Sequence, residues 1–151
     1  MSKIKTIGLV AHDACKQEMI QWVKENAAKL APHRLVCTGT TGRLVQEAFA
    51  QIMPKAEIDV SRLKSGPLGG DQQMGALIAE GQVDILVFFT DPMTMQPHDV
   101  DVKALMRISA IANIVLACTR ATADFIISSP LFEGDYQPVL DDHEDYIRRK
   151  L

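Results

Sequence analysis

Short apolar runs recur along the chain, and they alternate with segments whose apolar positions have helical spacing. Four of these runs predict strands, over Ile7–Ala11, Arg34–Cys37, Asp84–Phe89 and Ile114–Cys118. Residues Glu57–Leu63 predict a weaker, half-exposed strand, because Ile58 and Val60 alternate there with charged residues. Strands and helices are therefore expected to alternate along most of the sequence.

The segments between the strands predict helices. Asp13 is the expected N-cap of the first helix, whose apolar side carries Cys15, Met19, Trp22, Val23 and Leu30. The second helix is expected to run from the Thr38–Gly42 turn to about Ala50, and Gly81 is a stop signal for the third. The third and later helices are predicted over 71–80, 101–112 and 122–128, with a last polar helix within 141–149.

Strands that are buried on both faces and alternate with helices indicate a parallel sheet, and short right-handed crossovers place helices on both of its faces. The expected fold class is α/β, a single doubly wound, Rossmann-like domain over residues 1–151. We expect a mostly parallel sheet of about five strands flanked by helices.

Composition narrows the function. With 47% apolar and 23% charged residues, the chain resembles an ordinary globular protein, and its net charge of −3 without basic runs argues against nucleic-acid or polybasic membrane binding. The first apolar run is too short for a signal peptide or a membrane span, which favours a cytoplasmic protein. Cys15, Cys37 and Cys118 are few and far apart, so we interpret them as reduced packing thiols.

Polar residues collect at the carboxyl ends of the predicted strands, where open parallel sheets bind their ligands. The opposite ends carry no comparable set. Position therefore assigns four segments to one cleft: Ala11–Asp13 with Lys16, Thr38–Gly42, Ser65–Asp71, and Thr90–Pro92 with His98 and Asp99.

The Thr38–Gly42 segment is suited to bind an anion. Two glycines allow a sharp turn, three hydroxyls can donate hydrogen bonds, and the segment enters a helix N-terminus with free N–H groups. No Gly-Lys-Ser/Thr follows, so it is not a Walker A loop. A plain strand-to-helix turn with a Thr N-cap is the alternative, and Lys16 favours phosphate.

Ser65–Asp71 contains three glycines and a proline, a composition that brings the backbone close to a ligand. Asp71 follows where the chain enters a helix. It is either the N-cap of that helix or a base that takes a proton at the mouth of the cleft, and one carboxylate could serve both purposes.

The histidines and acids near the cleft leave several interpretations open. His98 lies in a proline-bounded loop beside acidic residues, where it is either structural or part of the site, and His12 could equally bond to backbone. His33 and His143 are interpreted as structural or surface residues. No metal-ligand spacing is present, and a phospho-receiver site would need an acidic pair where only Asp13 stands.

Taken together and in order, the motifs of this chain closely resemble methylglyoxal synthase from about Ile4 to Pro130. The motifs that carry the resemblance are Ala11-His12-Asp13 with Cys15-Lys16, Thr38-Gly39-Thr40-Thr41-Gly42, Ser65-Gly66-Pro67 with Gly69-Gly70-Asp71-Gln72-Gln73, Asp91-Pro92, Pro97-His98-Asp99 with Asp101-Val102-Lys103-Ala104-Leu105, and Ala121-Thr122-Ala123-Asp124-Phe125.

The resemblance implies a homohexameric lyase, without cofactor or metal, that converts dihydroxyacetone phosphate to methylglyoxal and inorganic phosphate. It implies that Asp71 takes a C3 proton as general base and that His98 hydrogen-bonds the substrate's oxygens and stabilises the enediolate. It assigns supporting carboxylates to Asp13, Asp91 and Asp101. It further implies that substrate and phosphate are bound by His12, Lys16, Thr38, Gly39, Thr40, Thr41, Ser65 and Gly66.

Two other functions remain open at this stage. Domains of the same fold regulate larger enzymes by sensing small anions, and such a module would bind phosphate without catalysis. A structural role in a hetero-oligomer is the other alternative, which the polar cluster at one sheet edge argues against. The presence of both Asp71 and His98 favours the enzyme, because a sensor needs no positioned base.

Overall fold

A computed structural model describes residues 1–150 of the protein; Leu151, which the single-domain prediction includes, lies outside the described residues. The chain forms one five-stranded sheet in which every neighbouring pair of strands is parallel. Its strands lie in the order β3 (Asp59–Arg62), β2 (Arg34–Cys37), β1 (Thr6–Ala11), β4 (Ile85–Phe89) and β5 (Val115–Ala117). The predicted doubly wound α/β class is confirmed.

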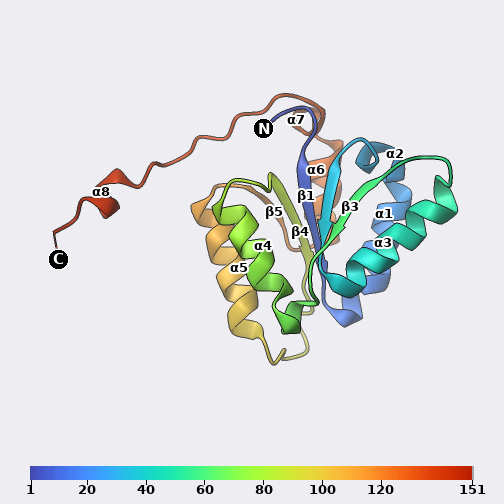
Figure 1. The fold of residues 1–151 in the computed structure, drawn as a ribbon, viewed down its shortest axis with the longest axis horizontal. Coiled ribbons are helices and arrows are strands. Elements are labelled where there is room, and N and C mark those ends of the chain that lie inside the picture. Colours follow the sequence, from blue (N-terminus) through green and yellow to red (C-terminus); the bar gives the residue numbers. More distant parts are fainter. Residues whose placement is uncertain (151) are drawn as a thin grey trace.

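Helices cover both faces of this sheet (Figure 1). The two short 3-10 helices are η1 (Asp13–Cys15) and η2 (Gly66–Leu68). The α-helices are α1 (Lys16–Glu25), α2 (Ala27–Leu30), α3 (Gly39–Ile52), α4 (Gly70–Ala79), α5 (Asp99–Ile111), α6 (Arg120–Ser128), α7 (Pro130–Glu133) and α8 (Glu144–Ile147). After α7 the chain runs away from the sheet, and α8 lies far from it (Figure 1).

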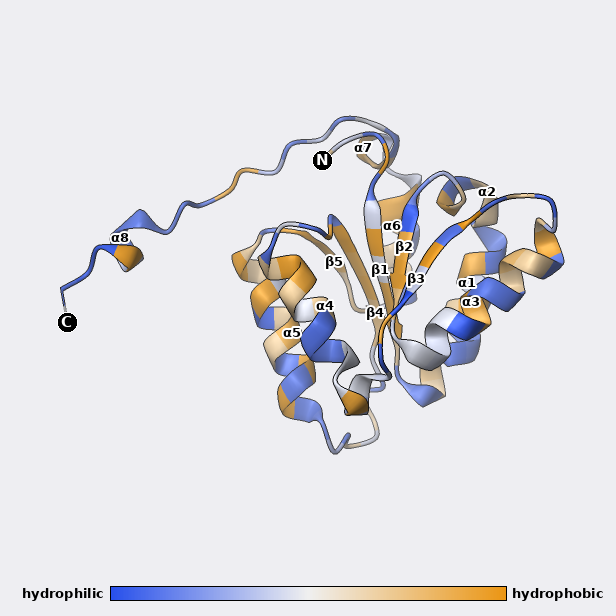
Figure 2. Cartoon of the chain, in the orientation of Figure 1, coloured by the Kyte–Doolittle hydropathy of each residue, from blue (hydrophilic) through white to orange (hydrophobic). Residues whose placement is uncertain are grey.

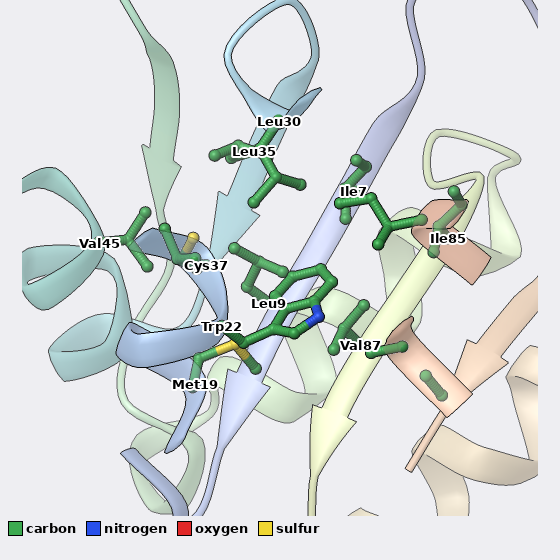
Figure 3. Close-up of a cluster of buried hydrophobic side chains, with 14 of the residues drawn as sticks. Ile7, Leu9, Met19, Trp22, Leu30, Leu35, Cys37, Val45, Ile85 and Val87 are labelled. Atoms are coloured by element: carbon green, nitrogen blue, oxygen red, sulfur yellow. The ribbon is translucent and has the colours of Figure 1, made fainter. Parts of the chain in front are cut away.

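Alternating strand residues supply two separate cores. Ile7 and Leu9 of β1 pack with residues of α1, α3, α6 and α7 on one face, whereas Val10 packs with α4 and α5 on the other. Figure 2 shows the central strands as largely apolar and the outer helix surfaces as polar. Figure 3 shows the first cluster, with Trp22 lying across Leu9. Burial of β1 on both faces explains why its sequence has no polar alternation.

The first helix differs from its prediction at both ends. A 3-10 turn precedes α1, and Asp13 makes no capping bond there, so the predicted Asp13 N-cap is wrong. Its carboxylate instead accepts a hydrogen bond from the Lys16 ammonium. The helix also breaks at Asn26, whose side-chain amide donates to the Trp22 carbonyl at 2.8 Å. A side chain that bonds to backbone competes with the helical ladder, which separates α1 from α2.

A glycine ends one helix and a threonine begins another. Gly81 has φ 72° and follows the end of α4, so the predicted stop signal is confirmed. Helix α6 begins at Arg120, two residues before the predicted start, because Thr119 caps it by accepting the N–H of Thr122. These caps satisfy backbone groups that have no partner inside the helix.

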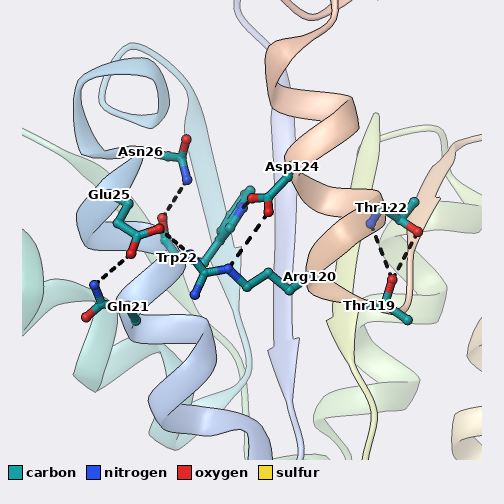
Figure 4. A network of polar contacts seen from close by, with 8 residues as sticks. All are labelled: Gln21, Trp22, Glu25, Asn26, Thr119, Arg120, Thr122 and Asp124. Carbon is teal, nitrogen blue, oxygen red and sulfur yellow. Dashed lines mark hydrogen bonds and ion pairs between the residues drawn. The ribbon is translucent and has the colours of Figure 1, made fainter.

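Polar contacts fasten α6 to α1 over the sheet (Figure 4). The Trp22 indole N–H donates to an Asp124 carboxylate oxygen at 3.1 Å. Arg120 pairs with Glu25 and lies 3.9 Å from the other Asp124 oxygen. The ring of Trp22 is therefore held in the core by packing and at its N–H by a hydrogen bond.

The strand register brings three strand ends to one level. Ala11 is opposite Phe89, and the next backbone N–H, that of His12, donates to the Phe89 carbonyl at 3.1 Å. On the other side, the Thr38 N–H bonds to the Leu9 carbonyl at 3.4 Å. The residues that follow β1, β2 and β4 therefore emerge side by side.

The three cysteines are unpaired, as predicted, and burial raises the pKa of the Cys37 thiol to about 12. His33 is structural, since its Nδ1 accepts the Lys5 backbone N–H at 3.1 Å. Among the described residues, no helix combines the length and the apolar character that crossing a membrane requires.

Replacement of Leu9 tests the central position of β1. Leu9 is completely buried, so Leu9→Ala should lower the free energy of unfolding by about 3 kcal/mol through lost packing and the cavity left behind. Urea denaturation measures the change. Val139→Ala is the control, because Val139 is 86% exposed and should change stability little. A cost for Leu9→Ala no larger than that of the control would contradict the assigned core.

Candidate active site

A cavity of about 350 Å³ lies at the carboxyl ends of β1, β2 and β4. The residues predicted for the site line this cavity, with three exceptions: Gly39, Asp91 and Asp101. The lining also includes Pro67 and Leu68 of the assigned Ser65–Asp71 segment, together with Val10, Phe88 and Gln96, which the sequence did not indicate. One feature of the sequence could have indicated Gln96 as a lining residue, namely its position two residues before His98 in the same loop. The four segments assigned to one cleft by position do meet there.

Unpartnered polar atoms are concentrated around this cavity. Within residues 1–150, the buried side-chain nitrogens and oxygens without a hydrogen-bond partner are His12 Nε2, Thr41 Oγ1, His98 Nδ1 and both Asp71 carboxylate oxygens. An unpaired buried polar group costs roughly 1–3 kcal/mol, so folded proteins rarely keep several in one place. Their convergence on one cavity indicates a site that a polar ligand completes.

Asp71 lies in the first turn of α4 and does not cap it. The N-cap is Gly69, with φ 108°, and no side chain accepts a capping bond. A Cβ on Gly70 would lie 1.9 Å from the Lys64 carbonyl oxygen, so only glycine fits where the chain enters the helix. The alternative that made Asp71 the N-cap is therefore wrong. The helix begins one residue before the predicted start, which places the carboxylate inside the cavity.

The environment of Asp71 favours its protonated form. The side chain is 1% exposed, and this burial is the main cause that raises the pKa of the carboxyl group. Asp101 also raises that pKa, which places its charge close behind the site although it does not line the cavity. His98 and His12 act in the opposite direction. Asp71 is thus a stronger base than an exposed aspartate.

His98 faces Asp71 across the cavity. It occupies the N-cap position of α5, and its Nε2 lies 3.6 Å from an Asp71 carboxylate oxygen. That separation permits electrostatic coupling but is too long for a hydrogen bond. The other ring nitrogen, Nδ1, is buried without a partner. Both His98 and Asp71 therefore retain hydrogen-bonding capacity for a ligand.

His12 is held by backbone on one side and is free on the other. Its Nδ1 accepts the Asp91 backbone N–H at 2.9 Å, so in the neutral ring the proton is on Nε2. Burial, and then the neighbouring His98, lowers the pKa of His12 and favours this neutral form. The structure thus confirms that His12 bonds to backbone, and its Nε2–H remains free for a ligand, so the substrate-binding role stays a prediction.

Asp91 supports the site through its backbone. Its carboxylate accepts the N–H groups of Met93 and Thr94, which closes the loop after β4, and these bonds lower the pKa of the carboxyl group. The side chain does not line the cavity. The resemblance implies a supporting carboxylate at Asp91, and that role stays a prediction; the contact that the structure shows is its N–H, which donates to His12.

The start of α3 carries the predicted anion cradle, residues Thr38–Gly42. Thr38 occupies the N-cap position without a side-chain cap, so the alternative of an ordinary Thr-capped turn is wrong. The backbone N–H groups of Thr40 and Thr41 make no hydrogen bond to another described residue. Lys16 adds a positive charge: its Nζ donates to the Ala11 carbonyl at 2.9 Å and to Asp13 at 2.8 Å. A third ammonium N–H is left for a ligand.

Glycines allow the segments of the site to approach one another. A Cβ on Gly66 would lie 3.1 and 3.3 Å from the two Asp71 carboxylate oxygens. A Cβ on Gly39 would lie 2.7 Å from Ser65 Oγ, so glycine at this position lets Ser65 approach the start of α3, although Gly39 does not line the cavity. Among residues 1–150, no group of three or more His, Cys, Asp or Glu could hold a metal ion.

The buried Asp71 predicts a pH-dependent stability difference. Because the pKa of Asp71 is raised in the folded protein, the contribution of this carboxyl group to stability is fully present below its unfolded pKa near 3.8 and is lost as pH rises through the folded pKa. Asp71→Asn removes this penalty, so it should stabilise the protein at pH 7 and have much less effect at pH 3.5. Urea denaturation at both pH values measures this; equal effects at both would contradict a raised pKa.

Comparison with known proteins identifies relatives over most of the chain. Residues 18–118 match a family model described as an MGS-like domain. Methylglyoxal synthase of Maridesulfovibrio salexigens is 52% identical over 157 aligned positions, which cover all of both chains. Methylglyoxal synthase of Pseudoalteromonas atlantica is 55% identical over 134 positions, covering 88% of this chain and 94% of the relative.

A solved structure is also similar throughout. The crystal structure of methylglyoxal synthase from Elizabethkingia anophelis superposes with a TM-score of 0.90 at 48% identity. The match covers all of this chain and 95% of that one. The similarity therefore includes the sheet, both helical layers and the segments around the cavity.

Proposed function

The chain belongs to the methylglyoxal synthase family, and on that basis we propose that its cavity converts dihydroxyacetone phosphate to methylglyoxal and inorganic phosphate. The observation that carries this proposal is the buried, unpartnered carboxylate of Asp71 beside an anion cradle. A phosphorylated carbon acid is the kind of substrate that uses both features. Formally the reaction is that of a lyase acting on a C–O bond.

Asp71 is the proposed general base. The phosphate-bearing carbon of the substrate is C1, and Asp71 takes a proton from the hydroxymethyl carbon C3. A base acts best when its pKa approaches the working pH, and burial moves the pKa of Asp71 in that direction. Ser65 and Gly66 form the loop above the carboxylate, and the absence of a side chain at Gly66 leaves it accessible.

His12 and His98 are the proposed donors to the oxygens of the enediolate. The neutral ring of His12 presents an Nε2–H that has no acceptor among the described residues. His98 lies beside Asp71, with its ring centroid 5.9 Å from that of His12. Oriented donors in a site shielded from water stabilise developing negative charge without having to reorganise. The two rings thereby take the role that a metal ion has in other enolising enzymes.

Lys16 and the start of α3 are the proposed phosphate site. The free N–H groups of Thr40 and Thr41 and the hydroxyls of Thr38, Thr40 and Thr41 surround the cavity end at the α3 N-terminus, where the helix dipole favours an anion. Phosphate leaves readily only if its C1–O bond stands perpendicular to the enediolate plane. By holding the phosphate, the cradle selects elimination over simple isomerisation.

The remaining properties are proposals of the same kind. The family resemblance supports a homohexamer, and the three unpaired cysteines support a cytoplasmic location. We propose that residues 1–151 act as a single domain, since all described strands join one sheet. A purely anion-sensing module is disfavoured, because sensing does not require a buried carboxylate without a partner.

Asp71→Asn tests the proposed reaction. Removing the base should lower methylglyoxal formation by about 10²- to 10⁴-fold, whereas inorganic phosphate should still bind at the cradle. A coupled assay that follows methylglyoxal and phosphate together measures the first effect, and calorimetric titration measures the second. Near-normal turnover by Asp71→Asn would disprove the base assignment. Phosphate binding by a wild-type protein that shows no turnover would favour the sensor.

Lys16→Met tests the phosphate site. Loss of a charged hydrogen bond should weaken phosphate binding roughly 10- to 100-fold and raise the KM by a similar factor. Lys24→Met is the matched control, because Lys24 lies on the same helix and does not line the cavity. Equal effects of the two substitutions would show that Lys16 acts only through the general charge of the protein.

A further inference from the structure

Lys64 connects the two halves of the proposed site through its backbone. On one side, its carbonyl oxygen accepts the N–H of Gly39, the first residue of α3 and part of the anion cradle, at 3.1 Å. On the other side, its N–H donates to Gln73 Oε1 of α4 at 2.8 Å. Because α4 also carries Asp71, this one residue links the phosphate cradle to the base.

The link is tight on the α4 side. Gly70 approaches the Lys64 carbonyl so closely that a Cβ would lie 1.9 Å from its oxygen, and the Gly70 N–H donates to the Ser65 carbonyl at 2.9 Å. The side chain of Gln73 completes this contact from the next turn of the helix. It is the one side chain among residues 1–150 that hydrogen-bonds the Lys64 backbone.

We propose that Gln73 is a positioning residue for phosphate elimination: by holding the Lys64 backbone, its side-chain amide fixes the helix of Asp71 relative to the anion cradle. This inference rests on the proposed function. Gln73 does not line the cavity, so it acts through Lys64 and not on the substrate. The spacing between cradle and base determines how the bound phosphate is turned relative to the carbon that loses its proton.

The enediolate has two fates that depend on this geometry. Asp71 takes the C3 proton, and the electron pair of the C–H bond forms the C2=C3 double bond while the carbonyl oxygen becomes negative. Return of the proton to C3 restores the substrate. Alternatively, the C3 hydroxyl loses its proton and becomes a carbonyl, the π bond shifts to C1=C2, and the C1–O bond breaks. Phosphate leaves with the electron pair and accepts the hydroxyl proton, and the resulting enolate takes a proton from solvent at C1 to give methylglyoxal.

Only the second fate requires the C1–O bond to stand perpendicular to the enediolate plane. Looser coupling between cradle and base should therefore slow elimination more than it slows proton return. The partition between the two fates is a readout that a loss of overall stability would not change.

The test measures both fates in D₂O with dihydroxyacetone phosphate. Deuterium in the residual substrate, followed by NMR at partial conversion, reports proton return, and methylglyoxal reports elimination. For Gln73→Met, which keeps the side-chain length but removes the acceptor, we expect elimination to fall roughly fivefold, the effect of losing one hydrogen bond, with a similar rise in the exchange-to-elimination ratio.

Two further variants make the comparison specific. Gln73→Glu retains an acceptor for the Lys64 N–H and should restore a ratio close to that of the wild type. Gln72→Met is the matched control, since Gln72 is also exposed on α4 and makes no side-chain hydrogen bond among the described residues. Its ratio should equal that of the wild type.

The outcomes separate this inference from the proposed function. If the wild type produces methylglyoxal but Gln73→Met keeps the wild-type ratio, whether its rates are unchanged or fall together, the positioning role is overturned and the proposed function stands. The same conclusion follows if Gln72→Met changes the ratio as much. If the wild type releases no methylglyoxal, the proposed function fails and this inference fails with it.

Discussion

The parallel pairing of β1 with β2 and β4 is the constraint on which the rest of the structure depends. Parallel strands end at the same edge of a sheet, and the register places Ala11 opposite Phe89 and Leu9 opposite Cys37. The polar segments that follow must therefore share one cavity. Burial of β1 on both faces keeps this register, because a slip by one residue would move each apolar side chain to the opposite core.

The cavity differs from the rest of the described protein because buried polar side-chain atoms there lack hydrogen-bond partners. Asp71 is buried without a hydrogen bond, although such burial opposes its ionised form. Backbone geometry maintains this state: glycines bring the Lys64–Gly70 loop against α4, and the helix begins early enough to carry the carboxylate inward. The folded protein thus tolerates a local energetic cost at Asp71, as is common at functional sites.

Backbone groups also orient the side chains and segments around the cavity. The Asp91 N–H selects the tautomer of His12, and the Lys64 backbone relates the cradle to α4. Because every residue except proline has the same backbone groups, the amino-acid type at a position does not reveal such a contact. The family resemblance therefore indicated Asp91 as a carboxylate, although its hydrogen bond to His12 is made by its amide, and the sequence pattern gave Gln73 no role.

The sequence by itself determined the strands, the fold class and the edge at which the chemistry gathers, because apolar periodicity and glycine-rich segments are local properties. It also identified most of the residues that line the cavity. It left undecided whether Asp71 caps a helix and whether Thr38 caps another, and it misplaced the cap at Asp13. Only the tertiary structure decided these points, because a cap or a buried charge depends on where distant segments place the backbone. For Asp71, the approach of Gly70 to Lys64 moved the helix start by one residue and left the carboxylate without a partner.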